Sequence, residues 1–79
     1  MELSFGEKLK LLRENAELTQ TELGEAVNMT QRKISYMEHG RYEPGLDDLR
    51  TFCRFFHVSA DYLLGLGKNL PFPKRNTQK

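Results

Sequence analysis

Apolar residues recur every three or four positions along most of the chain, which is the spacing of amphipathic helices. The first such stripe comprises Phe5, Leu9 and Leu12. Ser4 precedes this stripe and Glu7 follows three residues later, so their side chains can form a capping box at the start of a helix. The pattern predicts a helix that runs to about Asn15.

Two further helices are predicted close together. The second begins after Thr19 and its stripe comprises Leu23, Ala26 and Val27, while the third begins after Thr30 and buries Ile34 and Met37. Asn28 lies between them and tolerates left-handed backbone, so a tight turn is expected there. Gly24 has no side chain, which lets the two helices approach closely. Gly40 ends the third helix.

The fourth and fifth helices complete an all-α, five-helix prediction. The fourth has the apolar residues Leu46, Leu49, Phe52, Cys53 and Phe56, and the fifth, capped by Ser59, has Tyr62, Leu63 and Leu64 before Gly65. No strand pattern appears. We expect one domain over residues 1–66. Residues 67–79 contain two prolines and four basic residues and are expected to be extended or disordered.

Composition narrows the possible chemistry. The chain of 79 residues has a single cysteine, Cys53, so it cannot form an intramolecular disulfide. No metal-ligand spacing, Gly-rich phosphate loop or nucleophile–base pair is present, so we expect no metal, no cofactor, no small-molecule ligand and no enzymatic activity. Charges interrupt the first twenty residues throughout, which predicts neither a signal peptide nor a membrane span and favours a cytoplasmic protein.

Charge is unevenly distributed. The formal net charge is only +1. Residues 28–42 nevertheless carry three basic side chains and one acidic one, a balance of +2, and residues 67–79 carry four basic side chains and no acidic one. Positive charge in one short internal segment suits a local contact with phosphate groups.

The order and spacing of several motifs resemble the phage repressor and Cro-type helix-turn-helix proteins, often called the xenobiotic-response-element family of bacterial regulators. The matching stretches are FGEKLKLLR (5–13), LTQTEL (18–23), TQRKISYMEHG (30–40), EPGLDDL (43–49) and VSADYLLG (58–65). Glu17 and His57 depart from the family pattern, because glycine is usual at both positions and a left-handed backbone is expected there. Phe55 also replaces a typically small residue.

The resemblance implies a role for side chains on and around the third helix. Gln31, Arg32 and Tyr36 are expected to face base edges in the major groove, with Lys33 at the margin. Glutamine pairs well with adenine and arginine with guanine, so this chemistry is suitable. Backbone phosphates are the expected contacts of Gln20, Thr30, Ser35, Arg41 and Tyr42. Arg13 and Glu38 are expected to form a partly buried structural ion pair.

The sequence therefore predicts a protein that binds double-stranded DNA at specific sequences and regulates transcription, with repression as the expected direction. One recognition helix contacts few base pairs, so we expect a homodimer on an inverted repeat. Its predicted interface comprises Leu64, Leu66, Leu70 and Phe72. The alternative is a protein-interaction adaptor on the same fold that does not bind DNA. Acidic or apolar residues at positions 31–33 would favour the adaptor, and the chain has Gln31, Arg32 and Lys33 there.

Overall fold

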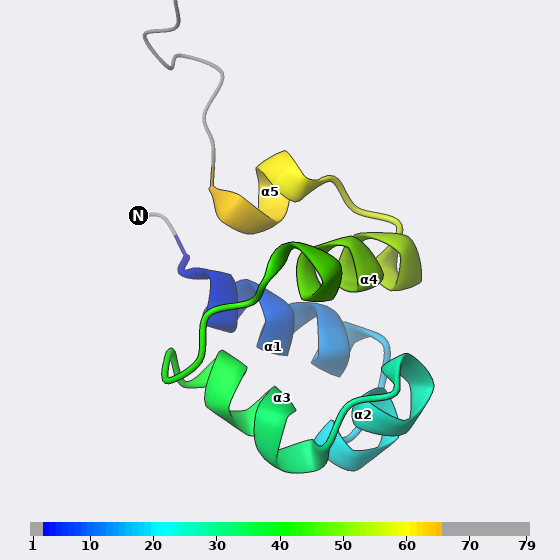
Figure 1. Cartoon of the computed structure of the whole chain (residues 1–79). Helices are drawn as coiled ribbons and strands as arrows, with labels where there is room; N and C mark the ends of the chain where they lie inside the picture. Colours follow the sequence, from blue (N-terminus) through cyan, green and yellow to red (C-terminus); the bar gives the residue numbers. More distant parts are fainter. Residues whose placement is uncertain (1–2, 66–79) are drawn as a thin grey trace, which may run out of the picture.

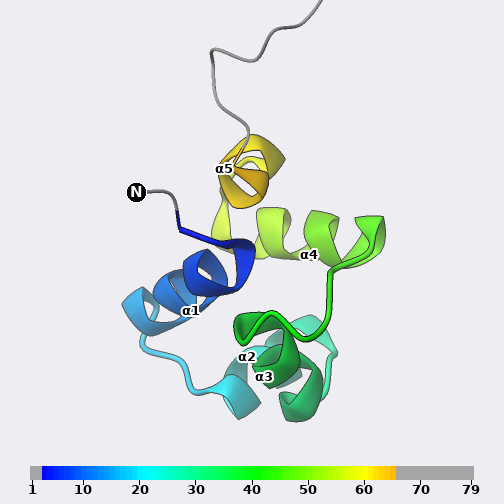
Figure 2. The ribbon, with the colours of Figure 1, turned by 90° about the vertical axis from the view of Figure 1, so that its left-hand side faces the viewer.

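A computed structural model describes residues 3–65, which form five helices and no strand (Figure 1). The helices are α1 (Phe5–Asn15), α2 (Gln20–Val27), α3 (Gln31–Glu38), α4 (Leu46–Phe56) and α5 (Ala60–Leu64). Their number and their order agree with the prediction. Two views show α2 and α3 together at one end of the molecule, α5 at the other end, and α1 and α4 between them (Figures 1 and 2).

The starts of α1 and α2 are fixed by pairs of side chains that are three residues apart in the sequence. The amide of Glu7 donates to the Ser4 hydroxyl at 3.1 Å, and the amide of Ser4 donates to the Glu7 carboxylate at 2.8 Å. Thr19 and Glu22 form the same capping box on α2. Each box satisfies backbone N–H groups that would otherwise lack partners. These caps explain why the predicted and observed helix starts coincide.

The core draws on all five helices. The fully or nearly fully buried apolar residues are Leu9, Leu23, Ile34, Met37, Leu49, Phe52 and Leu63. Burying one such side chain contributes about 1.5–3 kcal/mol. Because each helix supplies at least one of them, the position of α3 depends on the packing of the whole bundle.

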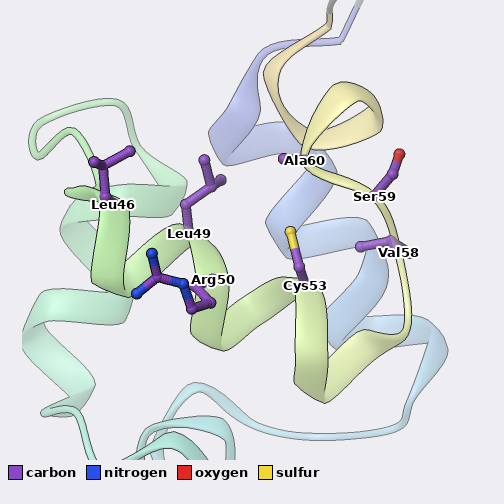
Figure 3. Close-up of a pocket in the computed structure, with 7 residues that line it drawn as sticks. All are labelled: Leu46, Leu49, Arg50, Cys53, Val58, Ser59 and Ala60. Atoms are coloured by element: carbon purple, nitrogen blue, oxygen red, sulfur yellow. The ribbon is translucent and has the colours of Figure 1, made fainter.

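Four residues assigned to apolar stripes are exposed. They are Ala26, Leu46, Tyr62 and Leu64, of which Leu46 is the most exposed at 77%. Leu46 is the first residue of α4. Cys53 is only half-buried and lines a groove between α4 and the segment that leads into α5, shared with Leu49 and Val58 among others (Figure 3). Helical spacing alone does not locate the ends of the buried face.

Lys8 is buried, with only 5% of its surface exposed, although the sequence pattern gives no sign of it. Its ammonium nitrogen donates to the backbone carbonyl of Tyr62 at 2.7 Å and lies 5.0 Å from the centroid of the Tyr62 ring. Lys8 therefore connects α1 to the last turn of α5. A positive charge at the C-terminal end of a helix is favourable, because the free carbonyl groups there carry partial negative charge.

Candidate nucleic-acid interface

The turn between α2 and α3 occupies residues 28–30. Asn28 has left-handed backbone at φ 60° and ψ 46°, as predicted, and the amide of Met29 donates to the carbonyl of Gly24 at 2.7 Å. A Cβ atom on Gly24 would lie 2.5 Å from the carbonyl oxygen of Met29. Gly24 is therefore required by the backbone of the turn, and not by the side chains of α3.

The two faces of α3 differ sharply in exposure. Ile34 and Met37 are fully buried, whereas Gln31, Arg32 and Tyr36 are exposed. The hydroxyl of Thr30 caps the helix by accepting a hydrogen bond from the amide of Lys33 at 3.1 Å. The buried face anchors α3, and the predicted base-reading side chains share the surface that remains open.

A chain of polar contacts runs from α1 to the start of α3. Arg13 pairs with Glu38 through two hydrogen bonds, Nε to Oε2 at 2.6 Å and Nη2 to Oε1 at 3.2 Å. The Gln20 amide donates to Glu38 at 3.0 Å, and the Gln31 amide donates to the Gln20 carbonyl oxygen at 2.6 Å. The hydrogen bond with Glu38 raises the pKa of Arg13 above its ordinary value. A buried ion pair thus supports an exposed glutamine through one intermediate side chain.

This contact gives Gln20 a partner that the sequence pattern does not indicate. Gln20 was expected to contact phosphate, and in the structure its side chain connects α2 to α3 within the protein. Both functional groups of its amide are used in this way. A phosphate contact by Gln20 remains a prediction, and the first backbone amides of α2 are the groups best placed for it.

Lys33 is also held within the protein. Its ammonium nitrogen lies 3.0 Å from Asp48 Oδ1 on α4 and 5.3 Å from the centroid of the Tyr42 ring. The hydrogen bond with Asp48 raises the pKa of Lys33. Lys33 and Tyr42 were expected at the DNA surface, and the structure brings Lys33 to both Tyr42 and Asp48.

Ser35, Tyr36 and Arg41 meet at the C-terminal end of α3, where they line a groove together with His39. His39 Nδ1 lies 2.8 Å from the carbonyl oxygen of Ser35. Nothing in the apolar pattern singles out His39, although its spacing of four residues from Ser35 places both on one helix face. Hydroxyl, imidazole and guanidinium groups together suit a phosphate group.

The predicted dimer interface lies only partly within the described residues 3–65. Leu64 is half exposed on α5, while Leu66, Leu70 and Phe72 lie outside residues 3–65.

Within residues 3–65, no cluster of three or more His, Cys, Asp or Glu side chains could hold a metal ion. None of the helices described there has the length and apolar character needed to cross a membrane.

Residues 4–63 match the family model described as a helix-turn-helix domain. The chain is 37% identical over 62 residues to the HTH-type transcriptional activator BcrR of Enterococcus faecalis, covering 78% of this chain and 30% of BcrR. It is 36% identical over 63 residues to the HTH-type transcriptional regulator ImmR of Bacillus subtilis, covering 80% of this chain and 50% of ImmR. The chain thus spans half or less of the length of these relatives.

A solved structure is similar as well. The P22 c2 repressor in complex with a synthetic operator superimposes with a TM-score of 0.74 at 29% sequence identity, covering 78% of this chain and 94% of that one. The five-helix arrangement is therefore that of a repressor whose structure contains its DNA site.

Proposed function

The chain belongs to the family of helix-turn-helix domains, and from this premise we propose that it binds double-stranded DNA at specific sequences and thereby regulates transcription. The observation that carries the proposal is the polar network that supports the exposed start of α3. A buried Arg13–Glu38 pair holds Gln20, and Gln20 holds Gln31. A base-reading side chain that is fixed before binding loses less conformational entropy on binding.

Three side chains of α3 are the proposed base readers. The Gln31 amide uses one N–H for Gln20, which leaves its second N–H and its carbonyl oxygen for the N7 and N6 groups of adenine. Arg32 is exposed on the first turn and suits the two acceptors of guanine. Tyr36, one turn further along, extends the same surface with an apolar ring and a hydroxyl.

Phosphate contacts are proposed on both sides of these readers. Thr30 flanks the start of α3, and Ser35 and Arg41 flank its end together with His39. Tyr42 and the first turn of α2, which begins at Gln20, add positions further out. Such contacts fix the orientation of the protein on the duplex without reading its sequence.

Repression by a homodimer is the proposed mode of action. A protein seated on a promoter excludes other proteins from that site and needs no further contact to repress. Leu64 on α5 and the apolar residues Leu66, Leu70 and Phe72 are the proposed interface. Because α5 lies at the opposite end of the molecule from α2 and α3 (Figures 1 and 2), a partner seated there leaves the proposed DNA surface open.

Selection of binding sites from random DNA tests the proposal. We expect enrichment of one inverted-repeat sequence, and a reporter driven by a promoter with that sequence should be repressed when the protein is expressed. The double variant Gln31→Ala with Arg32→Ala is the control that should lose this sequence preference. Both side chains are exposed, so their removal leaves the core intact. Recovery of no preferred sequence by the wild-type protein would contradict sequence-specific binding and favour the adaptor alternative.

A further inference from the structure

Two adjacent basic residues on the first turn of α3 have contrasting surroundings. Arg32 is exposed and, within residues 3–65, takes part in no ion pair. Lys33 is half-buried and lies against Asp48 and the Tyr42 ring. Only one of the two positive charges is therefore available to a ligand that approaches α3.

Asp48 is itself fixed by the start of α4. Its Oδ2 atom accepts a hydrogen bond from the amide of Gly45 at 3.3 Å, while its Oδ1 atom accepts one from Lys33. Both oxygen atoms thus have protein partners, and the Asp48 side chain is only 15% exposed. Because the cap orients the carboxylate, the ammonium group of Lys33 is drawn toward α4.

We propose that Asp48 withholds the charge of Lys33 from the DNA backbone and so limits sequence-independent binding. The inference rests on the DNA binding proposed above, and it replaces the expected base contact of Lys33. Non-specific affinity comes from cations that displace counterions from phosphates, whereas specificity comes from contacts with base edges. A lysine already neutralised by a carboxylate displaces no counterion. The same ion pair fastens α3 to α4, which favours a fixed orientation of the reading helix.

The substitution Asp48→Asn tests this role. Asparagine has a similar size and its carbonyl oxygen can still accept a hydrogen bond from Gly45, but it carries no charge. Affinity for a random duplex and for the selected site is measured by fluorescence anisotropy over a fourfold range of salt. If Lys33 gains one phosphate contact, the slope of log affinity against log salt steepens by about 0.9, which is a further loss of about 3.5-fold over that range. We also expect the ratio of specific to non-specific affinity to fall, because the operator complex loses an anchor of α3.

The chain offers a matched control one residue earlier. Asp47→Asn makes the same change in net charge, but the Asp47 side chain is 97% exposed and, among residues 3–65, forms an ion pair with Arg50 alone. Its slope should equal that of the wild type. The double variant Lys33→Gln with Asp48→Asn should return the slope to the wild-type value. Thermal melting of each variant confirms that it is folded.

Two results would overturn the inference while leaving the proposed function intact. One is that the wild-type protein binds the selected site, while Asp48→Asn and Asp47→Asn have equal slopes of log affinity against log salt. The other is a shallower slope, by about 0.9, for Lys33→Gln alone, since that would show that Lys33 already contacts a phosphate in the wild-type complex. Failure of the wild-type protein to bind any duplex would instead overturn the proposed function, and the inference with it.

Discussion

Arg13 and Glu38 are 25 residues apart in the chain and form a two-point ion pair between α1 and α3. Their side chains are 10% and 2% exposed, so the pair is largely removed from water. Arg13 also donates to the carbonyl of Leu18 at 2.7 Å, which fixes the connection between α1 and α2. One guanidinium group thus positions both helices of the helix-turn-helix.

Removing one partner of this pair should destabilise the fold. Arg13→Met leaves the carboxylate of Glu38 buried without its main partner, and Glu38→Leu does the same to Arg13. Breaking a buried pair from one side costs on the order of 3 kcal/mol, whereas replacing both partners with apolar residues costs much less. Urea denaturation of both single variants and the double variant measures the difference. If the single variants unfold at the wild-type midpoint, the pair contributes little to stability.

Two variants should distinguish the reading of a base by Arg32 from the positioning of Gln31 by Gln20. Arg32→Ala should weaken binding to the selected site by about 1–3 kcal/mol and relax the preference at one base pair, with little effect on a random duplex. Gln20→Ala should blur the preference at the base pair read by Gln31, because it removes the partner of that side chain. It should change binding to a random duplex little, because the backbone amide proposed to contact phosphate is kept. Anisotropy titrations on a set of single-base variants of the site give both profiles. Equal losses on specific and random DNA for Arg32→Ala would remove Arg32 from the base readers.

The helices were predictable because their signals are local. Ser4 with Glu7 and Thr19 with Glu22 form capping boxes at the spacing visible in the sequence, and Asn28 adopts the left-handed turn that its position indicates. The side-chain contacts of the site were harder to predict from the sequence. The pairing of Lys33 with Asp48 joins residues 15 apart and depends on where the loop after α3 places the first turn of α4, which no periodicity encodes. The same holds for Lys8 and Tyr62, which are 54 residues apart.

A methyl group at position 24 should loosen the helix-turn-helix. Alanine favours a helix over glycine by about 1 kcal/mol, but its Cβ would lie 2.5 Å from the carbonyl oxygen of Met29, a backbone atom that cannot move alone. We expect Gly24→Ala to lower the free energy of unfolding by about 2 kcal/mol, as overpacking commonly does. Thr21→Ala on the exposed side of the same helix is the control and should change stability by less than about 0.5 kcal/mol. Equal melting temperatures for the two variants would show that the turn adjusts.

Glycine at two strained positions should have the opposite effect. Glu17 and His57 have φ values of 61° and 58°, and both side chains are exposed. Left-handed backbone costs an ordinary residue about 1–2 kcal/mol, and glycine loses about half of that gain through its greater freedom in the unfolded chain. Glu17→Gly and His57→Gly should each stabilise the protein by about 0.5–1 kcal/mol. Asn28→Gly should change little, because asparagine tolerates this backbone. Calorimetry on the three variants checks the order, and a lower melting temperature for His57→Gly would assign that side chain a stabilising contact.

Two protein chains should bind each operator. The few base pairs contacted by one α3 cannot select a site among a genome's competitors, and a two-fold dimer doubles that information on half-sites about 34–36 Å apart. Leu64, half exposed on α5, is the one residue of the proposed interface that lies within the described residues 3–65.

Sedimentation of the complex with the selected duplex gives the number of protein chains per site for the full chain, for Leu64→Asp and for a chain truncated after Gly65. We expect two chains per site for the wild type and weaker, less cooperative binding for both variants. Because DNA itself can drive association that is weak in free solution, the measurement is made on the complex. One chain per site would rule out the dimer, and an unchanged pair in both variants would move its interface away from α5 and the residues that follow.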